Sequence, residues 1–241
     1  MQKPFLSIKE ASEYLGVSKD TLRRWHNNGM FRASIVSTGK HRFYAIVDLE
    51  LQLKGRVQMA KEWVESQNPS TPTADFYCQT SDIFRARSER MMTEMQNNLS
   101  FKDTWPIISS IVGEIGNNSF DHNLGNWPDI PGIFFAYDLG KRTLVLADRG
   151  NGVLQTLHRV RTSLHTEADA LLVAFTEIIS GRAPENRGNG LKYVKKAINA
   201  YQFTFTFQSG NAIIEITGKK PLLQTEPAQT PIHGCLFIMK F

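Results

Sequence analysis

Cysteine is scarce in this chain of 241 residues, and no long apolar run occurs in it. The two cysteines, Cys78 and Cys235, lie far apart, so we expect reduced thiols and neither a disulfide framework nor a cysteine-based zinc site. No stretch reaches the roughly 18 apolar residues of a membrane span. The first residues also lack the apolar core of a secretory signal. We therefore expect a cytoplasmic protein without a membrane partner.

An excess of acidic residues is also absent, and the basic excess is uneven. Residues 1–66 carry 11 Lys and Arg against 7 Asp and Glu, whereas the remainder carries 17 against 16. A basic segment suits a polyanion such as DNA, although many solvated surfaces are equally basic. Charge alone therefore favours a nucleic-acid partner for the front of the chain without establishing one.

A polar stretch with two prolines divides the chain. The sequence SQNPSTPTA at 66–74 disfavours helix and strand, and we assign residues 67–75 as a linker. The sequence thus predicts one domain at 1–66 and a second at 76–241.

Two short helices separated by a tight turn are predicted near the start. Ser7 and Glu10 have the spacing of a capping box for the first helix, and Gly16 ends it. Ser18 caps a second helix over 19–27. Helix, short turn and helix is the helix-turn-helix arrangement, whose second helix enters the major groove of DNA.

A small hairpin and a third helix complete the front segment. Strands at 35–37 and 42–44 flank a turn at 38–40, and Asp48 starts a helix over 49–65. Polar and basic side chains on the second helix and the hairpin tip are typical of contacts with phosphates and base edges. The DNA-binding candidates are Lys19, Thr21, Arg23, Arg24, His26, Lys40, His41 and Arg42.

Two separated signatures carry a family resemblance. The segments LSIKEASEYLGVS at 6–18 and TLRRW at 21–25 resemble the start of MerR-type and excisionase-type winged helix domains. The segment GKHRFY at 39–44, followed by Asp48, resembles their wing and next helix. The resemblance spans about residues 5–55 and implies binding to double-stranded DNA. A helical domain that docks a protein is the alternative.

The rear segment has the pattern of helices covering one face of a mostly antiparallel sheet, which is an α+β fold. Helices are expected at 81–97, 103–123, 167–179 and 191–200, with the rest of 153–186 as loop. Strands are expected at 133–137, 143–147, 203–208, 212–218 and 235–240.

Helix 103–123 has a polar face in addition to the face that carries its isoleucines. Glu114, Asn118, Asp121 and His122 follow at i, i+4, i+7 and i+8, and therefore share that face. Two acids, an amide and an imidazole on one face indicate a helix that lines a cavity or faces water.

Two glycine motifs follow. DRGNG at 148–152 comes directly after an apolar strand, where Asp148 can accept a hydrogen bond from an exocyclic amine and the glycines allow close approach of a ligand. RGNGL at 187–191 enters a helix, whose free N–H groups and dipole form an anion site. Arg187 or Lys192 can add a phosphate contact. An ordinary turn gives either motif on its own.

Together, the order and spacing of three motifs resemble the GHKL superfamily, which contains gyrase, Hsp-type chaperone ATPases, MutL and sensor histidine kinases. The motifs are E-x-x-x-N at 114–118, D-x-G-x-G at 148–152 and G-x-G-L at 188–191, and the resemblance spans about residues 80–241. It implies a GHKL (Bergerat-type) α/β sandwich with helices on one face of a mixed, mostly antiparallel sheet. It also implies ATP and Mg²⁺ as cofactors.

The resemblance implies roles for individual residues. Glu114 matches the general base that activates water in hydrolysing members. Asn118 would bind Mg²⁺, His122 would lie near the phosphates, and Asp148 would bind the adenine amine. The other cofactor-binding candidates are Gly150, Gly152, Arg187, Gly188, Gly190 and Leu191.

The sequence departs from the family in two respects. The final strand begins with Gly234 and Cys235 where many members have Gly-Thr, so the base contact is expected to be weaker or water-mediated. No helix carries a phosphoacceptor histidine box, which argues against an autophosphorylating sensor kinase. The segment 153–186 corresponds to the ATP lid, and its end at 181–184 indicates mobility.

Three functions stay open. The first is an ATP-responsive DNA-binding regulator with slow ATPase activity. The second is a serine protein kinase of the anti-sigma-factor type, because a His follows eight residues after the Glu of the first motif. The third is a gyrase-like clamp that dimerises on ATP. Double-stranded DNA, a target protein and a second copy of the chain are the expected partners.

Overall fold

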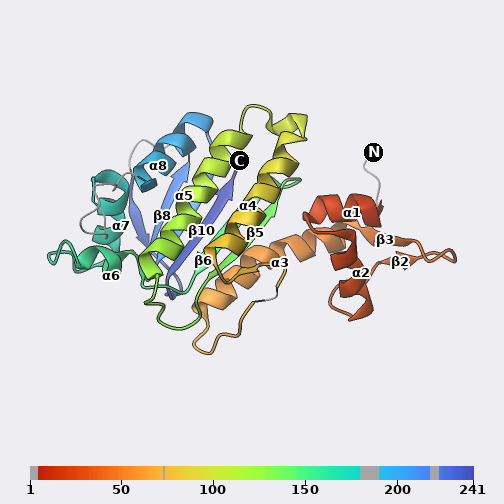
Figure 1. Cartoon of the computed structure of the whole chain (residues 1–241), viewed down its shortest axis with the longest axis horizontal. Coiled ribbons are helices and arrows are strands. Elements are labelled where there is room, and N and C mark those ends of the chain that lie inside the picture. The colour runs from red at the N-terminus through yellow and green to blue at the C-terminus, as the bar shows by residue number, and fades with distance from the viewer. Residues whose placement is uncertain (1–4, 73, 180–189, 218–222) are drawn as a thin grey trace. The chain divides into compact units, whose positions relative to one another are not determined.

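The computed structural model describes residues 5–72, 74–179, 190–217 and 223–241. The chain forms two compact units (Figure 1), one made of Met1–Met59 and Tyr137–Thr143 and the other of Ala60–Ala136 and Leu144–Phe241. The division falls within helix α3 (Ile46–Glu65). The segment 67–75 belongs to the second unit.

The first unit begins with helices α1 (Ile8–Leu15) and α2 (Lys19–Asn27), as expected. The capping box of α1 is confirmed, because Ser7 N donates to the Glu10 carboxylate at 2.8 Å and Glu10 N donates to Ser7 Oγ. Gly16 ends α1 in the left-handed conformation at φ 62°. Ser18 caps α2 by accepting from Thr21 N at 3.0 Å.

A three-stranded antiparallel sheet completes the first unit, in the order β1-β3-β2. The predicted hairpin of β2 (Ile35–Val36) and β3 (Arg42–Ala45) is confirmed. Strand β1 (Phe5–Ser7) was not predicted, because three residues are too few to show an alternating pattern. Helix α3 begins two residues before the expected Asp48. Among the described side chains, the core of this unit includes Ala11, Leu15, Leu22, Trp25, Tyr44 and Leu49.

The second unit is built on a seven-stranded sheet in the order β4-β5-β6-β10-β7-β8-β9. The strands are β4 (Tyr77–Cys78), β5 (Ile133–Asp138), β6 (Thr143–Asp148), β10 (Cys235–Lys240), β7 (Thr204–Ser209), β8 (Ala212–Thr217) and β9 (Thr225–Pro227). The run β10-β7-β8-β9 is antiparallel, and so is the pair β4-β5. The five expected strands are confirmed, whereas the short edge strands β4 and β9 were not predicted.

Three helices, α4 (Ser81–Gln96), α5 (Trp105–Asn123) and α8 (Gly190–Tyr201), lie side by side on one face of this sheet (Figure 1). The isoleucines of α5 at 108, 111 and 115 are buried, as the sequence pattern predicts. The α+β character of the rear segment is therefore confirmed. Among the described residues, no helix combines the length and apolar character that crossing a membrane requires.

Between β6 and α8 the structure differs from the expected pattern. Helix α6 (Gly152–His158) lies in a stretch predicted as loop, and that prediction was wrong. Its start has an unusual geometry, because the Asn151 side chain makes no cap hydrogen bond and Gly152 has a φ of 71°. Helix α7 (Glu167–Thr176) is confirmed but ends three residues earlier than expected. The segment 181–184 lies outside the described residues.

Candidate functional site

A buried carboxylate lies at the end of β6. Asp148 is 3% exposed, and its Oδ2 accepts a hydrogen bond from Ser119 Oγ on α5 at 2.7 Å. Its Oδ1 accepts from Gly150 N at 2.9 Å, and the backbone N–H of Cys235 also donates to the carboxylate. Helix α5 and strands β6 and β10 therefore meet at one acidic side chain.

The environment of Asp148 shifts its acidity. Burial raises the pKa of Asp148 to about 6, and the hydrogen bonds from Ser119, Gly150 and Cys235 lower it only in part. At pH 7 the carboxylate is therefore mostly ionised, yet poorly solvated. Such a group is a strong acceptor for a ligand N–H donor, and strongly shifted acids are concentrated at functional sites.

Glycines allow the backbone to close around this carboxylate. A Cβ on Gly234, which has a φ of 72°, would lie 2.2 Å from the Asp148 carbonyl oxygen. A Cβ on Gly150 would lie 2.1 Å from Asn123 Nδ2. Gly152 has a φ of 71°, and its Cβ would lie 3.1 Å from Ser209 Oγ. A side chain at Gly150 or Gly234 would displace the groups that hold Asp148 in place.

The polar face of α5 continues the site toward α8. Asn118 Nδ2 donates to Glu114 Oε1 at 3.2 Å, and both side chains are half-buried, as is His122. A Cβ on Gly190, the first residue of α8, would lie 1.6 Å from Glu114 Oε1, so the start of α8 contacts this carboxylate. The described parts of the three motifs therefore come together along α5.

The remaining cofactor candidates are not all described. Leu191 is half-buried in the first turn of α8. Arg187 and Gly188 lie outside the described residues. Lys192 donates through Nζ to the Glu177 carbonyl oxygen, and burial lowers its pKa.

Two α5 residues of this site were not predicted. Ser119 binds Asp148 directly, and Asn123 is buried one turn later. Asn123 Oδ1 accepts from Asn151 N at 2.8 Å, and Asn123 Nδ2 donates to the Ser119 carbonyl at 2.7 Å. Their spacing of four residues places them on one face of α5, which was the available signal.

A second polar cluster lies beside Cys235. Ser209 Oγ accepts from Val153 N at 2.9 Å and donates to Glu167 Oε2 at 3.1 Å. Burial raises the pKa of Glu167. Burial, reinforced by Asp148 and Glu167, also raises the pKa of the Cys235 thiol. Cys235 is therefore a neutral thiol at physiological pH.

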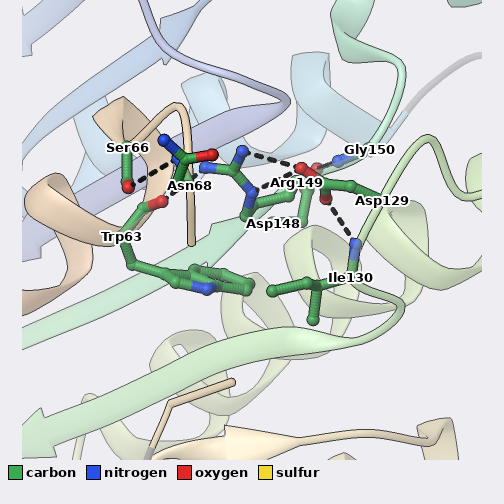
Figure 2. A network of polar contacts seen from close by, with 8 residues as sticks. All are labelled: Trp63, Ser66, Asn68, Asp129, Ile130, Asp148, Arg149 and Gly150. Atoms are coloured by element: carbon green, nitrogen blue, oxygen red, sulfur yellow. Dashed lines mark hydrogen bonds and ion pairs between the residues drawn. The ribbon is translucent and has the colours of Figure 1, made fainter. Parts of the chain in front are cut away.

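Arg149 lies between Asp148 and Gly150 in sequence, and its side chain is 1% exposed. Figure 2 shows the guanidinium between Asp129 and the backbone of Trp63. Its Nε donates to Asp129 Oδ2 at 2.8 Å, and a second nitrogen lies 2.7 Å from the same oxygen. A third nitrogen donates to the Trp63 carbonyl at the end of α3. This residue was not predicted as part of the site.

In the first unit, some of the DNA-binding candidates on α2 are exposed, and others make hydrogen bonds within the fold. Lys19, Arg23 and Arg24 are exposed, and Arg23 forms an ion pair with Asp20 at 2.5 Å. The Thr21 hydroxyl lies 2.9 Å from Ser18 Oγ and takes part in the cap of α2. Exposed basic side chains on this helix suit contacts with DNA.

His26 joins α2 to the segment before the hairpin, because its Nδ1 accepts from Ala33 N at 3.0 Å. Burial lowers the pKa of His26, and Arg42 and Arg32 lower it further, so the ring is neutral with Nε2–H as its donor.

The hairpin carries the other three candidates. Lys40 and His41 are exposed at the tip, and Lys40 has a φ of 60°. Arg42 donates to Asn27 Oδ1 at 3.4 Å, which ties the base of the hairpin to the end of α2.

Two helices joined by a tight turn and followed by an antiparallel hairpin define a winged helix-turn-helix. Residues 7–44 match the family model of the MerR family regulatory protein. No curated protein and no solved structure matches the chain. The match supports a DNA-binding regulatory role for the front of the chain.

Proposed function

We propose that this chain is a DNA-binding regulator that binds ATP with Mg²⁺ in its second unit and changes its affinity for DNA in response. The proposal depends above all on Asp148, a buried carboxylate held by Ser119 from the helix that also presents Glu114 and Asn118. The resemblance of the three motifs to the GHKL superfamily supports the same assignment.

The surroundings of Asp148 fit an adenine base. An exocyclic amine is a donor for an ionised, desolvated carboxylate. Glycines at 150 and 152 let the backbone beside Asp148 pack closely against Asn123 and Ser209. Cys235 stands where many family members have a threonine. A neutral, half-buried thiol is a weak hydrogen-bonding partner, so Asp148 makes the principal contact with the base.

The donor set on α5 fits a magnesium-bound phosphate chain. With Asn118 Nδ2 donating to Glu114, the amide oxygen Oδ1 is the atom that would bind Mg²⁺, which prefers oxygen ligands and phosphates. The N-terminal turn of α8 favours negative charge, and Gly190 brings it against Glu114. Glu114 would orient a water for slow hydrolysis. Arg187 and Gly188 remain predicted phosphate contacts.

The first unit supplies the DNA-binding surface. Arg23 and Arg24 on α2 would reach base edges and phosphates in the major groove, and Lys40 at the hairpin tip would contact the backbone. Such contacts release counterions, so the affinity for DNA should fall steeply as salt rises.

Calorimetric titration with Mg-ATP tests the nucleotide site. The wild type should bind, Asn118→Ala should give no binding heat, and Asn117→Ala, an exposed neighbour on the same helix, should behave as the wild type. The absence of binding heat for the wild type would contradict the proposal. Gel shifts with ATP, ADP and no nucleotide then test the response, and equal DNA affinity in all three would exclude it.

A further inference from the structure

We infer that Arg149 couples the nucleotide site to helix α3, and that it is the positioning residue through which bound nucleotide changes DNA affinity. This inference rests on the proposed function and names the route of its regulation. Helix α3 begins in the first unit and ends in the second, where the Arg149 side chain and the His233 backbone N–H donate to carbonyls of its last turn.

The first contact is made by the Arg149 side chain. Its guanidinium donates to the Trp63 carbonyl, which belongs to the last turn of α3. The final carbonyls of a helix have no partner within the helix, and a cation there is favoured by the helix dipole. Arg149 thus holds the end of α3, and it directly follows Asp148, the residue proposed to bind adenine.

A second contact reaches the same turn from the segment that precedes β10. His233 N donates to the Val64 carbonyl at 2.8 Å. The next residue, Gly234, packs against the Asp148 backbone so closely that a Cβ there would lie 2.2 Å from the carbonyl oxygen. Two consecutive carbonyls of α3 are therefore bound by the two segments that flank the Asp148 carboxylate.

Asp129 fixes the orientation of the guanidinium. Arg149 is buried at 1% exposure, and its Nε and a second nitrogen both lie within 2.8 Å of Asp129 Oδ2 (Figure 2). A buried cation without such a partner is strongly destabilising, so Arg149 has little freedom to adopt another orientation. A displacement of the backbone at 148–150 is consequently passed to Trp63 and not absorbed by the side chain.

Bound nucleotide acts on this arrangement from the Asp148 side. A base on Asp148 and a ribose near Gly150 would order the residues before and after Arg149. The last turn of α3 would then be held in one position, and the first unit, which shares α3, would bind DNA with a different affinity. The substitution Arg149→Lys keeps the positive charge but removes the planar guanidinium, which donates to Asp129 and to the Trp63 carbonyl at the same time.

The test compares Arg149→Lys with Arg159→Lys, a matched change at an exposed arginine of the same unit. DNA affinity is measured by fluorescence anisotropy with and without Mg-ATP, on a labelled duplex selected from a random-sequence pool by the wild type. A wild-type ratio of roughly tenfold is expected, a usual size for allosteric coupling. Arg149→Lys should reduce this ratio to about one, with the DNA affinity measured without Mg-ATP staying close to that of the wild type. Arg159→Lys should keep the wild-type ratio.

Asp129→Asn provides a second variant in case Arg149→Lys does not fold. It removes the charge that orients the guanidinium and should also bring the ratio close to one. A merely structural role would lower the melting temperature and leave the ratio unchanged, and that result in a folded variant overturns the inference. If the wild type does not bind Mg-ATP, the proposed function itself is overturned. If it binds Mg-ATP but its DNA affinity is the same with and without the nucleotide, only the nucleotide response and its route through Arg149 are overturned.

Discussion

Replacing Asp148 with asparagine should separate stability from nucleotide binding. The carboxylate is buried, and burial raises its pKa from 3.8 to about 6. Asparagine has the same shape, its Oδ1 can accept from Gly150 N, and its Nδ2 can donate to Ser119 Oγ. The substitution therefore removes the buried charge while keeping the main hydrogen bonds.

The direction of the effect follows from the direction of the pKa shift. A raised pKa means that the folded state prefers the protonated acid, so the stability contributed by Asp148 is complete below pH 3.8 and is lost as pH rises through about 6. The full shift corresponds to about 3 kcal/mol. Without nucleotide, Asp148→Asn should thus be more stable than the wild type by up to about 3 kcal/mol at pH 8, and the advantage should disappear near pH 4.

Urea denaturation at several pH values measures this difference, with Asp103→Asn, an exposed carboxylate just before α5, as the control. Mg-ATP affinity should change in the opposite direction and fall by roughly 10- to 100-fold, because a hydrogen bond to a charged acceptor is lost. An Asp148→Asn protein less stable than the wild type at pH 8 would refute the reasoning from burial. Unchanged affinity for Mg-ATP would refute the assigned base contact.

Three further substitutions test the proposed general base, the DNA-binding helix and the packing of Gly234. Glu114→Ala should keep Mg-ATP binding and abolish phosphate release, and turnover in the variant would refute its role as general base. Arg24→Ala should weaken DNA binding by roughly tenfold and reduce its salt dependence without affecting ATP affinity, as anisotropy at several salt concentrations can check. Gly234→Ala should lower the unfolding free energy by about 2 kcal/mol or more, because its φ is 72° and its Cβ would meet Asp148; an unchanged melting curve would contradict this.

Local signals in the sequence were sufficient for much of the fold. The caps at Ser7 and Ser18, the stop at Gly16 and the β2-β3 hairpin each depend on residues within a few positions of one another. Helix α6 could not be predicted, because it starts at a glycine without a side-chain cap. Residues 153–158 were therefore predicted as loop, because no local pattern marks the start of a helix.

Long-range contacts in the candidate site could not be read from local patterns. Asp148 was identified by its place after a strand, yet its partner Ser119 lies 29 residues earlier in the chain. The bond from Arg149 to Trp63 spans 86 residues, and nothing in the DRGNG motif indicates it. Such contacts depend on how α3, α5 and β6 pack together, which single-sequence periodicity does not specify.

Amide hydrogen exchange with and without Mg-ATP reports where a ligand acts on the chain, so it is the sharpest check on a nucleotide site at Asp148. We expect slower exchange in peptides covering 114–122 and 148–153, with no comparable change in Asn118→Ala. If saturating Mg-ATP leaves both peptides unchanged, or protects only other regions, the nucleotide site does not lie at Asp148.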